Sequence, residues 1–352
     1  MLSRPLPRFA IVATVLLLLA SGSYFARAAP ADDGPKAAHE AAVLDRIFAN
    51  WKARHDRVSS FHFVFDCRTT CKKGSADFLS RSNPPAVLSK DQVFEQRGAE
   101  LWVEGDDRMC EASTPHWKLP HASSIDKPRS ERNVILGPTT ARYWGSASPW
   151  LGDASPQKWQ PCGVLWRTAT DRPLSIYGSG AILLAFRPQH PSLSWLRKDC
   201  RLVDEKALLN EVPHVELQRV VQSKRIPGGR IAGYAETIWT SPARDDLVVR
   251  WKTESGAMST CLGRINYTKD RTHGWIPFEW SCDYSGVELD EYKVTSYSIN
   301  EKIDPTVFST EFPAGTPVYD QRAERIRYFV VEKDGSHRTL SPQEFARLRE
   351  PH

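Results

Sequence analysis

The seven cysteines are the residues of this chain with the widest chemical repertoire, because a thiol can form a disulfide, bind a metal or act as a nucleophile. They are Cys67, Cys71, Cys110, Cys162, Cys200, Cys261 and Cys282. In an oxidising compartment, their odd number leaves at least one outside any disulfide within the chain. Cys261 and Cys282 fall in neighbouring candidate strands joined by a turn, so we predict a disulfide between them. Cys67 and Cys71 flank a short polar turn and form a second candidate pair.

Metal binding is the alternative for Cys67 and Cys71. No histidine or second cysteine pair lies at ligand spacing beside them, as a zinc site would require. A thioredoxin-like redox role would need C-x-x-C, which the sequence lacks. We therefore predict neither a metal site nor a cofactor.

No catalytic motif stands out. Ser124-Ile125-Asp126-Lys127 matches S-x-x-K, but its companion motifs are missing. The G-x-S-x-G, H-E-x-x-H and phosphate-loop patterns are absent. His62 alternates with phenylalanines in a candidate strand, and we expect a surface residue rather than a catalytic base. The chain is predicted not to be an enzyme.

Residues 1–28 have the pattern of a secretory signal. Arg4 and Arg8 precede an apolar run of 12 residues, Phe9–Ala20, and Ala26-Arg27-Ala28 is an A-x-A cleavage site. The run is shorter than the roughly 20 residues of a membrane-spanning helix, although an uncleaved anchor is the alternative. No later segment is apolar enough to span a membrane. We expect an exported periplasmic or extracellular protein, with residues 29–39 as a disordered leader.

The charge of the chain gives no support for nucleic-acid binding. Residues 1–28 carry three positive and no negative side chains, so their removal lowers the formal net charge from +5 to +2. No dense Lys/Arg cluster that could follow a phosphate backbone remains.

The elements that would position any site begin with a helix and a strand. Apolar side chains recur at helical spacing between Val43 and Trp51, which predicts an amphipathic helix near residues 43–54. After Ser59-Ser60 the period changes to two. Phe61, Phe63 and Phe65 then alternate with His62, Val64 and Asp66, which predicts a strand with one aromatic face.

Further strands are predicted along the chain, most of them in its second half. They are Gln92–Phe94, Glu100–Glu104, Arg108–Ala112, Asn133–Leu136, Cys200–Asp204, His214–Val221, Gly233–Thr240, Asp246–Thr253, Ser259–Tyr267, Trp275–Tyr284 and Tyr292–Asn300. Seven consecutive strands with short turns indicate an antiparallel meander, because parallel neighbours would need crossover connections. The expected class is α+β, mainly β, with an antiparallel sheet packed against the N-terminal helix.

Two further parts of the chain have patterns of their own. Residues 143–198 are rich in tryptophan and proline and are predicted to be a helical or irregular insertion, with Ser175–Phe186 as a candidate short helix; a separate small domain is the alternative. Residues 321–352 are predicted to form a hairpin and a short final helix opened by the capping box Ser341-Pro342-Gln343-Glu344.

Several segments together resemble the exported family of outer-membrane lipoprotein carriers. They include Val58-Ser59-Ser60-Phe61 after the helix and the hairpin from Leu202-Val203-Asp204-Glu205 to Val212-Pro213-His214-Val215-Glu216-Leu217. The others are Ile238-Trp239-Thr240-Ser241-Pro242-Ala243-Arg244-Asp245, Leu247-Val248-Val249-Arg250 and the closing Phe308 with Phe312-Pro313-Ala314-Gly315-Thr316. The resemblance covers about half of the mature chain. It implies that residues 40–320 form a highly curved half-barrel, closed by helices and carrying the insertion.

The resemblance also implies that the concave face of the sheet binds acyl chains, a lipid or a lipidated protein. The candidate ligand-binding residues, which we place on consistent faces of their strands, are Phe61, Phe63, Phe65, Trp102, Trp239, Val249 and Trp251. The alternative for each is a core position against helix 43–54. For the whole protein, the alternative is an envelope scaffold that binds another protein. The sequence leaves the ligand and the oligomeric state open.

Overall fold

The computed structural model describes residues 34–75, 87–106, 108–113, 131–137, 139–144, 162–167, 180–190, 193, 195–221, 224–226, 229–231, 233–255, 259–323 and 325–349. The chain divides into two compact units, Met1–Ala41 and Ala42–His352. Of the first unit, only the beginning of helix α1 (Gly34–Arg57) is described. The predicted signal segment and the Ser124–Lys127 motif lie outside the described residues. The predicted leader is too long, because the helix already begins at Gly34.

The second unit is built on one sheet of sixteen strands. Its first half contains β1 (Ser60–Cys71), β2 (Gln92–Glu104), β3 (Arg108–Ser113), β4 (Glu131–Leu136), β5 (Thr139–Trp144) and β6 (Cys162–Arg167). Its second half contains β7 (Cys200–Leu209), β8 (Val212–Val221), β11 (Tyr234–Ser241), β12 (Leu247–Ser255), β13 (Ser259–Asp270), β14 (Gly274–Tyr284) and β15 (Glu288–Ile299). The last three strands are β16 (Pro317–Asp320), β17 (Arg327–Val331) and β18 (His337–Leu340). A separate two-stranded sheet pairs β9 (Lys224–Ile226) with β10 (Gly229–Ile231).

The helical elements are few and short after α1. They are α2 (Gly180–Phe186), α3 (Pro342–Arg349) and the 3₁₀ turns η2 (Arg197–Asp199), η3 (Pro242–Arg244) and η4 (Pro305–Phe308). Helix α3 begins at the predicted capping box: Ser341 N–H donates to Glu344 Oε2 at 2.8 Å, and Glu344 N–H donates to Ser341 Oγ at 3.2 Å.

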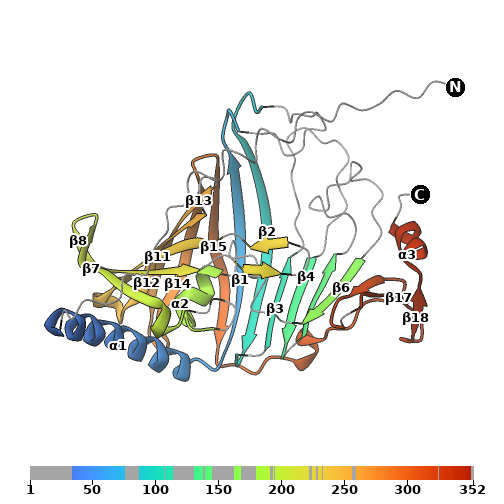
Figure 1. Cartoon of the computed structure of the whole chain (residues 1–352), viewed down its shortest axis with the longest axis horizontal. Coiled ribbons are helices and arrows are strands. Elements are labelled where there is room, and N and C mark those ends of the chain that lie inside the picture. The colour runs from blue at the N-terminus through green and yellow to red at the C-terminus, as the bar shows by residue number, and fades with distance from the viewer. Residues whose placement is uncertain are drawn as a thin grey trace. The chain divides into compact units, whose positions relative to one another are not determined.

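The strand order is β18-β17-β16-β6-β5-β4-β3-β2-β1-β15-β14-β13-β12-β11-β8-β7 (Figure 1). Strand β1 is central and pairs antiparallel with β2 on one side and with β15 on the other. The predicted meander is confirmed for all seven strands, β7, β8 and β11 to β15, and the mainly β class with it. The pairing of β16 with β6 is parallel, whereas every other pairing described in this sheet is antiparallel.

The region 143–198 differs from a simple insertion. It contributes strand β6, which pairs with β5 in the main sheet. The sequence pattern predicted neither of these two strands. It also contains α2, whose seven residues are all buried. The C-terminal hairpin β17–β18 continues the same sheet through β16, so the predicted boundary at residue 320 falls within the sheet.

The sheet carries a hydrophobic core on each face. We call the face that carries Phe61, Phe63 and Phe65 the front face, and the face that carries His62 the back face. The front core joins α1 and α2 to β1, β2 and the β11–β15 meander. The back core joins β3–β6 and β16–β17 to the segment that contains η4.

Candidate functional site

Helix α1 brings an apolar stripe to the front core. The stripe consists of Val43, Leu44, Ile47, Phe48 and Trp51, all of them buried. Asp246, in the turn before β12, anchors the helix: it accepts a hydrogen bond from Asn50 Nδ2 at 2.7 Å, and its carbonyl accepts one from Trp51 Nε1 at 2.8 Å. Asp246 is 1% exposed and adopts a φ of 55°, a conformation that aspartate tolerates better than most residues.

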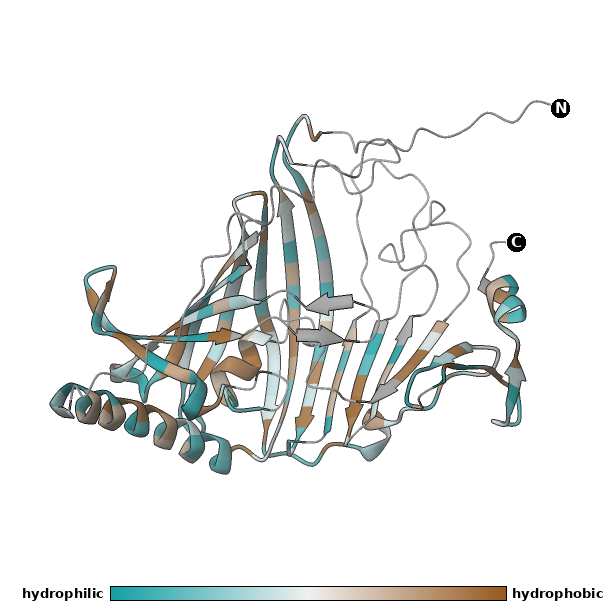
Figure 2. Ribbon diagram, viewed as in Figure 1, coloured by the Kyte–Doolittle hydropathy of each residue, from teal (hydrophilic) through white to brown (hydrophobic). Residues whose placement is uncertain are grey.

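The three phenylalanines of β1 form the aromatic centre of the front face. Phe61 and Phe63 pack against Phe186 of α2, with ring centroids 5.2 and 5.6 Å apart. Phe65 packs against Trp280, at 5.2 Å. Helix α2 has the sequence GAILLAF and is almost uniformly hydrophobic (Figure 2), so it can lie on this face only as a fully buried segment.

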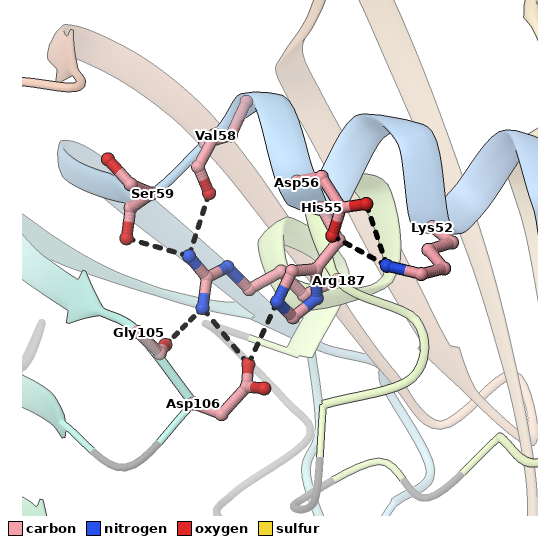
Figure 3. Close-up of polar contacts among 8 residues, drawn as sticks. All are labelled: Lys52, His55, Asp56, Val58, Ser59, Gly105, Asp106 and Arg187. Carbon is pink, nitrogen blue, oxygen red and sulfur yellow. Dashed lines mark hydrogen bonds and ion pairs between the residues drawn. The ribbon is translucent and has the colours of Figure 1, made fainter.

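Arg187 ties the end of α2 to the end of α1 and to the β2–β3 turn (Figure 3). Its Nη2 donates to the carbonyl oxygens of Val58 and Ser59, at 2.7 and 2.8 Å. Its Nη1 donates to the Gly105 carbonyl and to Asp106 Oδ1, the latter at 3.1 Å. The side chain is 1% exposed. Burial lowers the pKa of Arg187 and Asp106 opposes that shift, so the contact holds a buried cation against carbonyl oxygens.

Two histidines lie close to this contact. His55 Nε2 is 3.2 Å from Asp106 Oδ1 (Figure 3). His190 N–H donates to the Arg187 carbonyl at 2.8 Å, and its side chain is buried. Burial lowers the pKa of His190 to about 4, with Asp106 opposing the shift and Arg187 and His55 adding to it. His190 is therefore neutral at neutral pH.

Arg54 is the second buried arginine of the front core, on the side of α1 that faces α2. Its guanidinium carbon lies 4.6 Å from the ring centroid of Phe186, and its Nη2 donates to the Trp275 carbonyl. A basic side chain within the predicted helix would be expected off the apolar stripe, but Arg54 is only 4% exposed. Its spacing of three residues from Trp51 and seven from Ile47 is the signal that could have placed it there.

The structure divides the seven predicted ligand-binding residues between the two faces. Phe61, Phe63, Phe65 and Trp251 belong to the front core. Trp102 lies on the back face, where it stacks on His62 with ring centroids 4.7 Å apart. Trp239 lies beside Arg250 and donates to Glu216 Oε2 at 3.2 Å.

Val249, the last of the seven predicted ligand-binding residues, is half-buried. It lies where the register between β11 and β12 shifts, between the pairs Trp239–Arg250 and Thr240–Val248. The front-face position of Trp251, by contrast, is secured by Gly263 on β13, because a Cβ there would overlap the Trp251 ring. The seven candidates therefore do not share one face of the sheet, since Trp102 and Trp239 lie on the back face.

Neither candidate disulfide is formed in the structure. Cys67 and Cys71 lie four residues apart in one extended strand, not across a turn, and four strand residues span about 13 Å. Cys261 opposes Tyr284 and Cys282 opposes Gly263, so these two are diagonal rather than directly opposite. The hydrogen bond to Cys261, with burial, raises the pKa of Cys282 well above that of an ordinary thiol.

Burial limits the reactivity of two further thiols in the same way. Burial raises the pKa of Cys67 and that of Cys200 to about 12. A protonated thiol is a poor nucleophile and a poor metal ligand. Among the residues described, no group of three or more His, Cys, Asp or Glu side chains is placed to hold a metal ion, and no helix is both long and apolar enough to span a membrane.

The comparisons with known proteins found relatives only among solved structures, since no family model and no curated protein matches. An outer membrane lipoprotein-sorting protein domain from Vibrio parahaemolyticus is 10% identical, with a TM-score of 0.43, over 76% of this chain and 95% of that one. A LolA superfamily protein from Nitrosomonas europaea is 9% identical, with a TM-score of 0.40, over 76% and 97%. A DUF1329 family protein from Desulfovibrio piger is 8% identical, with a TM-score of 0.36, over 77% and 97%.

The resemblance to lipoprotein carriers that the sequence suggested is also found among these solved structures. At these identities and TM-scores, the function of this chain has to be argued from its own residues.

Proposed function

We propose that the front face binds the acyl chain of a lipid or of a lipidated protein, without catalysis. The observation that carries this proposal is α2: seven consecutive buried residues, all apolar, that pack on Phe61 and Phe63. A helix this short is marginal by itself, so its place on the sheet depends on side-chain packing. An acyl chain offers the same aromatic surface a similar apolar contact, and we propose that it takes the place of α2 there.

Lipid extraction and native mass spectrometry on the purified protein test the proposal. We expect a bound acyl lipid at a defined stoichiometry, or uptake of added fatty acid or lipopeptide. A mass equal to that of the protein alone, with no uptake of either added compound, would contradict it.

A matched pair of variants tests whether α2 competes with the ligand. Leu184→Ala removes packing from α2, where Leu184 is 4% exposed, and should increase acyl uptake. Leu348→Ala in α3 removes a side chain of the same size from a part of the molecule distant in sequence, and should leave uptake unchanged. A loss of uptake in Leu184→Ala would mean that α2 forms part of the site rather than occupying it.

Export is part of the proposal, because an acyl carrier of this kind would work outside the cytoplasm. The support is the signal pattern of residues 1–28 with its cleavage site at Ala26-Arg27-Ala28. The intact mass of the protein from a periplasmic or secreted fraction should correspond to a chain that begins at Ala29. Recovery of the full-length chain from the cytosol would contradict export.

A protein-binding scaffold is the second candidate. The β7–β8 hairpin exposes apolar side chains, of which Leu208 is 67% and Val220 57% exposed. Strand β7 is also an edge strand, whose free backbone groups could pair with a partner. A protein that takes up no lipid, and loses a binding partner on Leu208→Asp, would favour this candidate.

A further inference from the structure

The environment of Arg54 contains more hydrogen-bond donors than acceptors. Arg54 is 4% exposed, and its only hydrogen bond among the described residues runs from Nη2 to the Trp275 carbonyl. The N–H groups on Nε and Nη1 have no acceptor within hydrogen-bond distance in the part of the chain that the structure describes. Each such buried donor carries an uncompensated desolvation cost.

Arg54 also differs from the other buried arginines in its charge partner. Arg187 forms an ion pair with Asp106, and Arg219 forms one with Glu236. No carboxylate of the described residues lies within 4.0 Å of a nitrogen of Arg54. Burial lowers the pKa of Arg54 to about 10, with Tyr267 and Asp245 opposing the shift and Arg57 adding to it, so the side chain is still a cation at neutral pH. A lone buried cation is costly unless a counter-charge joins it.

The indole groups of the front core add to this excess of donors. Trp251 is 3% and Trp280 2% exposed, and neither Nε1–H has an acceptor among the described residues. The nearby hydroxyl of Tyr267 is itself a donor, since it gives its proton to the Val248 carbonyl at 2.6 Å. A molecule that enters this core therefore meets N–H groups that need acceptors, inside a surface that is otherwise apolar and aromatic.

We propose that Arg54 binds the carboxylate of a fatty-acid-like ligand whose hydrocarbon chain lies against the front face. This inference rests on the proposed acyl-binding function and adds the chemical class of the head group. A carboxylate supplies acceptors and no donors, and its single negative charge balances the single guanidinium. A phosphate monoester shares the acceptor chemistry but brings a second negative charge, which the single buried guanidinium does not balance.

The test compares ligands that share a chain and differ in the head group: hexadecanoic acid, hexadecanol, methyl hexadecanoate and hexadecyl phosphate. Dissociation constants are measured for the wild-type protein, for Arg54→Met and for Arg57→Met. Arg57 lies on the same helix but is exposed, so its replacement is the matched control. We expect the wild type to bind the acid about tenfold or more tightly than the alcohol and the ester, as a charge-assisted hydrogen bond would give. Arg54→Met should abolish this preference and Arg57→Met should retain it.

Each of the other outcomes is distinct. Equal binding of acid, alcohol and ester by the wild type would overturn the assignment of Arg54 and leave acyl binding intact. Tightest binding of the phosphate would overturn the carboxylate assignment. Binding of none of the four would overturn both this inference and the proposed function.

A stability measurement without ligand gives a second readout. Because Arg54→Met removes a buried charge without a counter-charge and keeps the aliphatic part of the side chain, we expect its melting temperature to equal or exceed that of the wild type. A large fall in melting temperature would mean that the guanidinium is structural, and would overturn the inference.

Discussion

The front core and the back core lie on opposite faces of one sheet and are built from similar side chains. They differ in whether their buried polar groups have hydrogen-bond partners. Each places an aromatic ring over a glycine: Trp251 over Gly263 on the front face, and Phe312 over Gly163 on the back. The back core is closed by the chain's own η4 segment, which Arg132 holds through the carbonyl of Thr306 at 3.2 Å. Of the described buried side-chain atoms that lack a hydrogen-bond partner, those of Arg54, Trp251 and Trp280 lie on the front face, whereas the hydrophobic side chains of the back core carry none and Arg250 Nε is one on the back face.

This difference separates a structural core from a candidate binding surface. Burying a donor without an acceptor costs stability, so a core whose only role is packing would not be expected to retain several of them. We infer that the front face has a role beyond holding the fold together, and the following experiments test that distinction.

The largest effect should come from truncating one aromatic ring in each core. Phe63 and Phe308 are 0% and 2% exposed, and we expect Phe63→Ala and Phe308→Ala each to lower the free energy of unfolding by about 3–5 kcal/mol. Chemical denaturation measures both. Only Phe63→Ala should also weaken acyl binding. If both variants weaken it equally, the contrast between the faces does not hold.

A smaller loss of stability is expected when the pH is lowered, and it comes from His190 on the front side. Since the pKa of His190 falls from its ordinary value of 6.5 to about 4, the unfolded chain binds a proton at higher pH than the folded one. His190 therefore contributes stability that is fully present above about pH 6.5 and is lost as the pH falls to about 4, by about 3 kcal/mol. Over this pH range, the free energy of unfolding should fall more steeply with decreasing pH in the wild type than in His190→Gln. Parallel curves would show that His190 does not titrate as a buried neutral group.

The smallest effect should come from Trp239, a candidate that the structure places on the back face. Its contacts are with the exposed side of the sheet, through Arg250 and Glu216. We expect Trp239→Ala to lower the free energy of unfolding by about 1 kcal/mol and to leave acyl binding unchanged. Trp251→Ala is its matched partner on the front face and should weaken acyl binding. Loss of binding in Trp239→Ala alone would place the ligand on the back face.

The sequence predicted features that depend on local pattern and missed those that depend on pairing. Phe61, Phe63 and Phe65 share a face because side chains alternate along any strand. The face of Trp102 depends on its pairing with His62, which the pattern of β2 does not reveal. Cys67 and Cys71 were assigned to a turn because the intervening residues are polar, yet these residues continue β1.

The charged side chains of α1 hide part of its buried face in a similar way. Arginine is rarely buried, so the sequence alone does not indicate that Arg54 lies in the core, and only the packing of α2 against the helix shows it. Helix α2 was within the predicted candidate helix Ser175–Phe186, but its place on the front face depends on contacts with strands far away in sequence. Strand β6 lies within the tryptophan- and proline-rich region 143–198 and β5 ends in it, and neither strand alternates clearly, so no local signal marked them.

The pairing of β1 with β15 has a consequence for how the chain can fold. Phe61 pairs with Ile299, so the strand at the centre of the sheet joins segments separated by most of the chain. The strands on the two sides of β1 can form their own local hairpins early, but they become one sheet only after residue 299 has been synthesised. Non-local pairing of this kind slows folding, because the entropy of closing a long loop is lost before the contacts form. Until then the phenylalanines of β1 have no partner strand on the β15 side, and this is the interval in which the nascent chain is most exposed to aggregation.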